Sequence, residues 1–195
     1  VGESYYPIST SFATVDVYSA GSSDRVGGLV GYNDDDITDS YATGYIYAGD
    51  DSTEIGGLVG YNSDHIFESY ATGNVYGGVD SDRVGGLVGI NYFWVTSSYA
   101  TGNVEGYSRV GGLAGTNRWV LIASHATGDV EGFFGVGGLV GFNSGNEFEG
   151  GPNGNVVTLA NGEVKNYEPL LQYGGFETQS IMGSYSTGDV TIVDS

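Results

Sequence analysis

Apolar residues, glycines and one asparagine follow one another in a fixed order in a short phrase that recurs five times along the chain. The phrase reads Val/Ile-Gly-Gly-Leu-Val/Ala-Gly-x-Asn, and its copies start at Val26, Ile55, Val84, Val110 and Val136. The period is constant over the first three copies and slightly shorter over the last three. A second phrase, Ser-Tyr/His-Ala/Ser-Thr-Gly-x-Val/Ile, starts at Ser40, Ser69, Ser98, Ser124 and Ser184, and its first four copies follow the first phrase at a constant distance. Self-similarity at a period of this length predicts an array or a solenoid.

The residue types within one repeat favour short strands over helices. The apolar runs are no longer than a strand, and they lack the three-and-four spacing of an amphipathic helix. The 195 residues include 36 Gly, 16 Tyr and 8 Phe, which indicates strands joined by tight turns. A propeller blade needs four strands, more than one repeat supplies. We therefore predict an all-β fold, a β-solenoid of about five to six stacked coils with about 26–29 residues each.

Stacked coils turn each repeat position into a column of like side chains, because neighbouring strands lie about 4.7–4.9 Å apart. One predicted apolar column comprises Leu29, Leu58, Leu87, Leu113 and Leu139. A second comprises Val30, Val59, Val88, Ala114 and Val140, and a third Ile37, Ile66, Val95, Leu121 and Ile181. Adjacent residues of a regular strand point to opposite faces, so burial of both Leu29 and Val30 requires a bend or a bulge. The sequence leaves open whether both are buried.

Three polar, aromatic and glycine patterns follow the same period. We expect an amide ladder with a structural role, with ligand binding as the alternative, at Asn33, Asn62, Asn91, Asn117 and Asn143. An aromatic column is predicted at Tyr41, Tyr70, Tyr99, His125 and Tyr185. This column is interpreted as a packed or half-exposed stripe, with a carbohydrate-stacking platform as the alternative. The paired glycines indicate either positive φ angles or a close approach between the walls of a thin coil.

The domain organisation is expected to be simple. We predict an N-terminal tail over residues 1–10 and one solenoid domain over residues 11–195, interrupted by an insert at about 144–178. The Asn161–Gly162 step between strand-like runs predicts a hairpin in this insert, which is either a tolerated decoration or a contact surface for a partner. Both ends of the repeat array resemble ordinary coils without polar caps. The expected assembly edges are Phe12, Val15, Val17, Val190 and Ile192.

The charge balance narrows the possible partners. Asp and Glu total 24 against 5 Lys and Arg, a formal net charge of −19, which argues against binding nucleic acid or anionic lipid. No apolar stretch is long enough to cross a bilayer, so we expect no membrane insertion. Calcium or another cation is a possible ligand of the acidic turns, with purely solvated turns as the alternative. The candidate ligands are Asp34, Asp35, Asp36, Asp50, Asp51, Asp80 and Asp82.

The residue before the first phrase predicts a column of charges. It is Arg25, Glu54, Arg83 and Arg109 in successive repeats, which places Glu54 between two arginines. Arg109 next to Arg83 is a like-charged pair for which the sequence suggests no compensation.

The two phrases, Gly-Gly-Leu-Val-Gly and Ser-Tyr-Ala-Thr-Gly-Asn-Val, resemble the GLUG motif repeat over about residues 11–143 and 181–193. This resemblance implies an extracellular structural or adhesive module, similar to arrays in large bacterial and archaeal surface proteins, including immunoglobulin A1-cleaving metallopeptidases. The chain has no His-Glu-x-x-His motif, so that peptidase activity does not carry over. The start at Val1, without Met or an apolar leader, suits a secreted, processed protein.

Taken with the repeat pattern, these features predict an extracellular, cell-surface protein that assembles end to end with copies of itself into a filament, fibre or sheath. The alternative is an adhesin that recognises a glycan or a protein. We expect no enzymatic activity, no catalytic residues and no organic cofactor, because two histidines and no cysteine cannot supply a zinc cluster or a Cys-His nucleophile.

Overall fold

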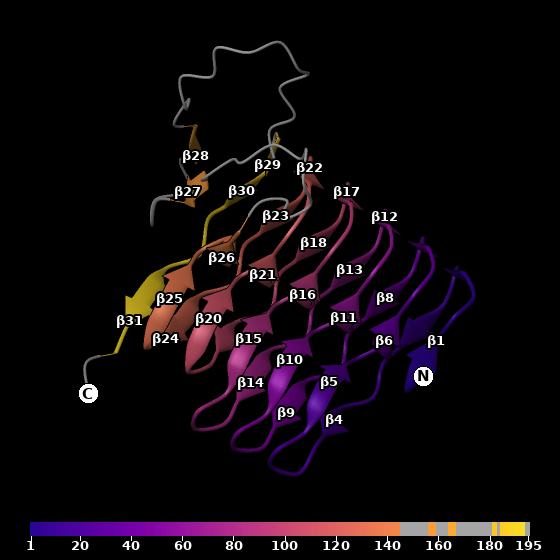
Figure 1. Ribbon diagram of the computed structural model, residues 1–195, viewed down its shortest axis with the longest axis horizontal. Helices are drawn as coiled ribbons and strands as arrows, with labels where there is room; N and C mark the ends of the chain where they lie inside the picture. Colours follow the sequence, from indigo (N-terminus) through magenta and orange to yellow (C-terminus); the bar gives the residue numbers. More distant parts are fainter. Residues whose placement is uncertain (145–155, 159–163, 167–180, 183, 194–195) are drawn as a thin grey trace.

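The computed structural model describes residues 1–144, 156–158, 164–166, 181–182 and 184–193. In this part of the chain, short parallel strands from successive coils pair side by side and build a β-solenoid (Figure 1). The predicted all-β solenoid is therefore confirmed.

One coil consists of five strands joined by turns. The first complete coil contains β5 (Asp24–Gly27), β6 (Val30–Asn33), β7 (Ile37–Thr38), β8 (Tyr41–Ala42) and β9 (Ile46–Ala48). The next coil contains β10 (Thr53–Gly56), β11 (Val59–Asn62), β12 (Ile66–Phe67), β13 (Tyr70–Ala71) and β14 (Val75–Gly77). It is followed by β15 (Asp82–Gly85), β16 (Val88–Asn91), β17 (Val95–Thr96), β18 (Tyr99–Ala100) and β19 (Val104–Glu105).

The later coils repeat this order. The fourth complete coil contains β20 (Ser108–Gly111), β21 (Ala114–Asn117), β22 (Leu121–Ile122), β23 (His125–Ala126) and β24 (Val130–Gly132). The last contains β25 (Phe134–Gly137), β26 (Val140–Asn143), β29 (Ile181–Met182), β30 (Tyr185–Ser186) and β31 (Val190–Ile192). The later repeats are shorter because the connection between the fifth strand of one coil and the first strand of the next is shorter. Between β14 and β15 this connection comprises residues 78–81, whereas between β19 and β20 it comprises only residues 106–107.

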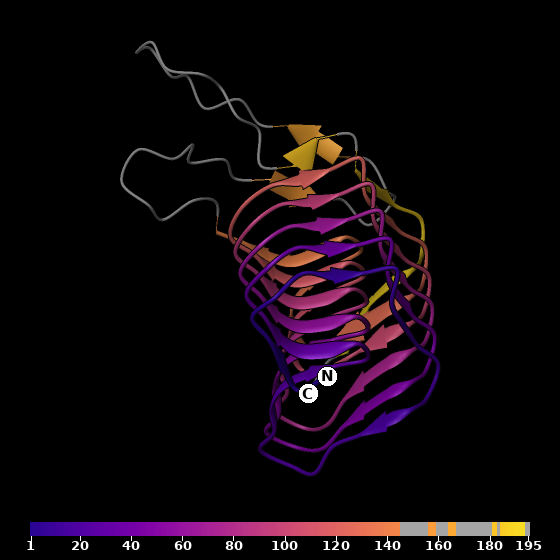
Figure 2. The same cartoon turned by 90° about the vertical axis from the view of Figure 1, so that its right-hand side faces the viewer.

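The coils lie directly over one another in register. Five parallel sheets result, with the strand orders β1-β6-β11-β16-β21-β26, β25-β20-β15-β10-β5, β2-β7-β12-β17-β22-β29, β3-β8-β13-β18-β23-β30 and β31-β24-β19-β14-β9-β4. Ile55 pairs with Val26 on one side and with Val84 on the other, so the first phrase of each repeat stacks on the same phrase of its neighbours. Figure 2, which views the stack from its N-terminal end, shows the superimposed coils.

Residues 1–10 are part of the solenoid, so the prediction of a tail is wrong. They carry β1 (Glu3–Ser4) and β2 (Ile8–Ser9), which pair in parallel with β6 and β7. β3 (Phe12–Ala13) and β4 (Val17–Tyr18) complete this first coil by pairing with β8 and β9. Strand pairing depends on backbone groups, which explains how a segment without the Gly-Gly-Leu phrase joins the stack.

Two apolar cores run along the solenoid. The larger contains the predicted leucine column, the neighbouring valine column, the positions equivalent to Ile37 as far as Leu121, and the alanines of the second phrase. The smaller contains the positions equivalent to Val26 and Ile46. Leu29 and Val30 are both buried, because the chain bends between them and both of their backbone N–H groups donate to the Leu58 carbonyl at 2.9 and 3.2 Å.

The phrase glycines serve close approach and not positive φ. A Cβ on Gly57 would lie 2.1 Å from the Gly86 carbonyl oxygen and 2.9 Å from the Ala71 Cβ. The second glycine of the phrase therefore lets two walls of the coil meet against a column of small residues, and this contact separates the two cores.

The insert is described only in part. β27 (Val156–Thr158) and β28 (Val164–Asn166) pair antiparallel, with Val157 opposite Lys165, which confirms the predicted hairpin pairing. The other residues of the predicted insert at 144–178, apart from Ser144, lie outside the described residues.

Candidate functional site

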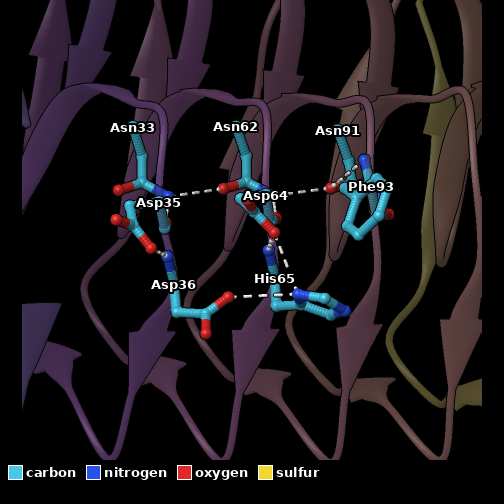
Figure 3. A network of polar contacts seen from close by, with 8 residues as sticks. All are labelled: Asn33, Asp35, Asp36, Asn62, Asp64, His65, Asn91 and Phe93. Atoms are coloured by element: carbon cyan, nitrogen blue, oxygen red, sulfur yellow. Dashed lines mark hydrogen bonds and ion pairs between the residues drawn. The ribbon is translucent and has the colours of Figure 1, made fainter. Parts of the chain in front are cut away.

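The predicted asparagine column is a continuous hydrogen-bonded ladder at the ends of β6, β11, β16, β21 and β26, and Figure 3 shows its part from Asn33 to Asn91. Each Nδ2 donates to the Oδ1 of the equivalent asparagine in the next coil at 2.9 Å, in the order Asn33, Asn62, Asn91, Asn117, Asn143. The same Nδ2 also donates to a carbonyl two residues later, that of Asp35, Asp64, Phe93 or Trp119. The first four amides are fully buried. The ladder therefore stabilises the turn, and a ligand cannot reach these amide groups.

The ladder stops one coil short of the N-terminal end. Ser4 stacks on Asn33 in the first coil, but its hydroxyl donates to the Tyr6 carbonyl at 2.9 Å. Asn33 Oδ1 is consequently buried without a hydrogen-bond partner.

The predicted aromatic column consists of rings stacked face to face along the solenoid axis. Adjacent centroids are 4.8–5.3 Å apart and adjacent planes within 11° of parallel in the order Phe12, Tyr41, Tyr70, Tyr99, His125, Tyr185. Each interior ring has both faces covered by its neighbours, and a sugar ring needs a free aromatic face to stack. Only the outer faces of Phe12 and Tyr185 lack a ring neighbour within the described residues.

The column of charges before the first phrase forms the expected ladder. Glu54 pairs with Arg25 at 3.4 Å and with Arg83 at 3.2 Å. Burial raises the pKa of the Glu54 carboxyl above its ordinary value, and the two arginines offset this only in part. Arg109 is compensated by Asp82, whose Oδ1 accepts from the Arg109 Nε at 2.7 Å. Asp82 also lies 3.6 Å from Arg83, so one carboxylate separates the two like charges.

A mixed group of two carboxylates and one imidazole lies beside the asparagine ladder (Figure 3). We call it the Asp36–Asp64–His65 cluster. His65 Nδ1 is 3.0 Å from Asp36 Oδ1 and 2.9 Å from Asp64 Oδ1. One potential ligand atom from each residue lies within 4.8 Å of the others. Within the described residues this is the one group of three or more His, Cys, Asp or Glu residues that could hold a metal ion.

Of the predicted cation ligands, only Asp36 joins such a group among the described residues. The others have contacts within the chain or occupy turns. Asp34 accepts from the Tyr32 hydroxyl at 3.1 Å, Asp35 from the Asp36 backbone N–H at 2.8 Å, and Asp50 from the Val79 backbone N–H at 2.9 Å. Asp82 binds Arg109, and Asp51 and Asp80 each occupy a left-handed turn position with φ of 57°.

Sequence reasoning missed Asp64 and His65. The signal was available in the period, because Asp64 and His65 lie one full period after Asp35 and Asp36. Stacking therefore places His65 over Asp36. A comparison of equivalent positions for identical or similar residues does not single out a position occupied by Asp in one coil and His in the next.

The predicted assembly edges lie in the outermost coils. Phe12 in β3 and Val17 in β4 are at one end of their sheets, and Val190 and Ile192 in β31 are at the other end (Figure 1). Val15 is exposed in the turn before β4, and Val17 packs partly against the smaller core. Most of the exposed large apolar side chains belong to these two coils, namely Val1, Tyr5, Tyr6, Phe12, Val15, Tyr18, Phe134, Phe142, Tyr185 and Ile192.

Comparison with known proteins identifies the repeat. The family model described as the GLUG motif matches residues 22–47, 51–76 and 80–105, three successive stretches that each run from the turn before the first strand of a coil into its fifth strand. Comparisons with curated proteins and with solved structures found no match. No helix among the described residues has the length and hydropathy needed to cross a membrane. The chain is therefore a β-solenoid protein that contains three GLUG-motif repeats.

Proposed function

We propose that this protein is an extracellular structural protein that stacks end to end with copies of itself into a filament, fibre or sheath. The observation that carries the proposal is the match between the two outer edges of the solenoid. The first and last coils share four of the five solenoid sheets in the same register, and only the sheet from β5 to β25 has no strand in the first coil, so along those four sheets the last coil offers the edge on which another first coil fits. The extracellular location is part of the proposal and is supported by the GLUG repeats.

The backbone supports such stacking. Within the described residues, the strands of the outermost coils are paired on one side only. A row of unpaired N–H and C=O groups on a sheet edge is a template for another strand. A second copy of this chain is the occupant that fits best, because it continues the parallel register of the sheets.

The side chains of the two edges are complementary. Phe12 and Tyr185 end the same aromatic column, so stacking of two copies would place Tyr185 of one against Phe12 of the next. A ladder of side-chain caps runs through the same region, because Asp16 Oδ1 accepts from the Tyr45 N–H at 2.8 Å and Asp129 Oδ1 accepts from the Asp189 N–H at 2.9 Å. Asp189 Oδ1 would accept from the Asp16 N–H of the next copy in the same way.

The net charge of −19 opposes association. Salt screens surface charges, with a Debye length of about 10 Å at 0.1 M ionic strength. We therefore expect assembly to strengthen as ionic strength rises from a few millimolar.

The adhesin alternative has less support from the geometry. The faces of the interior tyrosine rings are covered, and most of the insert lies outside the described residues. The proposal includes no catalytic activity.

Cysteine cross-linking tests the proposed junction, because the chain contains no cysteine of its own. Residues 12 and 185 of stacked copies would lie one strand spacing apart, about 4.7–4.9 Å, which is within the Cα separation that a disulfide spans. The double variant Phe12→Cys/Tyr185→Cys should form a ladder of covalent multimers under oxidising conditions. A mixture of the two single variants should stop at covalent dimers that contain one chain of each.

The matched control moves one cysteine out of the aromatic column and one coil inward. Tyr45 is exposed but precedes β9, which the outermost strand β4 separates from the edge, so Tyr45→Cys/Tyr185→Cys should give no ladder. Equal multimer formation by both double variants, or none by the first at any ionic strength, would refute the in-register junction.

A further inference from the structure

We propose that the Asp36–Asp64–His65 cluster binds one divalent transition-metal ion, with Zn²⁺ as the best fit, and that the ion links two neighbouring coils. Asp36 follows β6 in one coil, whereas Asp64 and His65 follow β11 in the next. This inference is independent of end-to-end assembly.

The spacing of the donor atoms suits a small cation. Zn²⁺ lies about 2.0–2.2 Å from nitrogen and oxygen ligands in tetrahedral sites, which places the ligand atoms about 3.3 Å from one another. The two distances from His65 Nδ1, 3.0 and 2.9 Å, are close to this value. A small outward movement of exposed side chains would accommodate the ion, and the fourth position would face solvent.

The donor set favours a transition metal over calcium. An imidazole nitrogen suits Zn²⁺, Cu²⁺ and Ni²⁺, whereas Ca²⁺ takes six to eight oxygen ligands. Two carboxylate oxygens converge on Nδ1, which carries at most one hydrogen and cannot satisfy both oxygens fully. A cation between the three atoms would neutralise both carboxylates at once.

Further contacts hold the ligands in place. The rings of His65 and Phe93, which belongs to the following coil, meet edge to face with centroids 4.7 Å apart and planes at 87°, and the Trp94 ring centroid lies 5.9 Å from that of His65. Asp64 Oδ1 accepts the His65 backbone N–H at 2.8 Å, which fixes that carboxylate. Ligands oriented by neighbouring groups lose little freedom on binding. The next coil carries Trp94 at the position of His65, and among the described residues such a group occurs between one pair of coils only.

Isothermal titration of the metal-free protein with ZnCl₂ tests this site, with CaCl₂ as the comparison. The wild-type chain should bind one Zn²⁺ ion through this site. Asp36→Asn and His65→Phe should each weaken that binding at least about tenfold, and His65→Phe keeps an aromatic ring against Phe93. The matched control is Asp35→Asn, which removes a charge from the same turn, retains the side-chain acceptor for the Asp36 N–H and should leave the affinity within about twofold.

Nuclear magnetic resonance of the unmodified chain gives a readout that does not depend on variants. The chain has two histidines, and His125 is stacked between Tyr99 and Tyr185 in the aromatic column. Zn²⁺ should shift the ring nitrogen signals of His65 and leave those of His125 unchanged. Absence of Zn²⁺ binding, equal binding by all variants, or equal shifts of both histidines would overturn the proposal.

Discussion

At the scale of single residues, buried polar groups find their partners in the neighbouring coil. The Asn62 amide, fully buried, bonds Asn33 on one side and Asn91 on the other. A buried amide left without a partner costs about 1–3 kcal/mol, so the column constrains both the residue type and the register. The unpartnered Asn33 Oδ1 marks the end of the ladder, where the outer coil offers it no amide donor.

Ser4→Asn should stabilise the protein by about 0.5–1.5 kcal/mol, because the new side-chain amide would donate to Asn33 Oδ1 and extend the ladder by one coil. Urea unfolding monitored by circular dichroism measures this change. Ser4→Asp has a similar shape but offers no N–H donor, and it should be no more stable than the wild type. Equal stabilisation by both variants would contradict the assignment to a hydrogen bond.

Glu54 provides a pH-dependent contribution whose sign follows from its burial. The folded pKa of this carboxyl is raised above the ordinary value, so the folded chain holds a proton that the unfolded chain releases first. Stability from this group is therefore present below the ordinary glutamate pKa and is lost as pH rises through the raised folded value.

Glu54→Gln removes this titration, so the stability of the variant relative to the wild type should increase as pH rises through that window. Unfolding free energies measured between pH 4 and pH 8 check the difference, and the exposed Glu105→Gln controls for the loss of one charge. A relative stability that falls with pH would show that the ion pairs with Arg25 and Arg83 outweigh burial.

At the scale of elements, strands of only two to four residues depend on their neighbours for stability. Each inner coil is held by backbone bonds to two others and by the tight contact between the phrase glycine and the alanine column. The glycine is needed because the opposing atom is a backbone oxygen, which cannot move aside without breaking the register.

Gly86→Ala should destabilise the protein by about 3 kcal/mol or more, the upper end of the range for overpacking. Its Cβ would lie 2.1 Å from the Gly112 carbonyl oxygen and 2.9 Å from the Ala100 Cβ. Gly2→Ala is the control, because nothing lies within 4 Å of its Cβ position, and its effect should stay within about 0.5 kcal/mol. Chemical denaturation of both variants measures the difference, and similar losses would contradict the close-approach role.

The sequence predicted those elements that carry a repeated phrase. The columns of Leu58, Asn62 and Tyr70 follow from one period and a strand spacing. β1 and β2 were missed because Glu3-Ser4 and Ile8-Ser9 pair through the backbone and share almost no phrase with the later coils.

The repeat pattern also did not predict contacts between residues of different types. Asp82 neutralises Arg109 from a position that is offset from the period, so a column of equivalent residues does not contain both. The bend that buries both Leu29 and Val30 is a property of the backbone at a corner between two sheets, and residue types alone do not specify it. The contact between His65 and Asp36 can be recognised only after the coils are aligned with one another.

At the scale of the whole molecule, the solenoid is nearly one-dimensional. Each coil contacts mainly the coils before and after it, so an outer coil differs from an inner one chiefly in having one neighbour within the described residues. Addition of a second copy in register would give an outer coil the environment of an inner one. A contact of this kind, head to tail and without closure, generates a filament.

Cryo-electron microscopy of the purified chain over a range of ionic strengths tests this central claim most directly. We predict unbranched filaments one solenoid wide, with a layer line at about 4.7–4.9 Å along the filament axis, which is the spacing of stacked coils. Particles of single-chain size at every concentration and ionic strength, or filaments whose strand spacing of about 4.7–4.9 Å runs across the axis, would contradict end-to-end stacking.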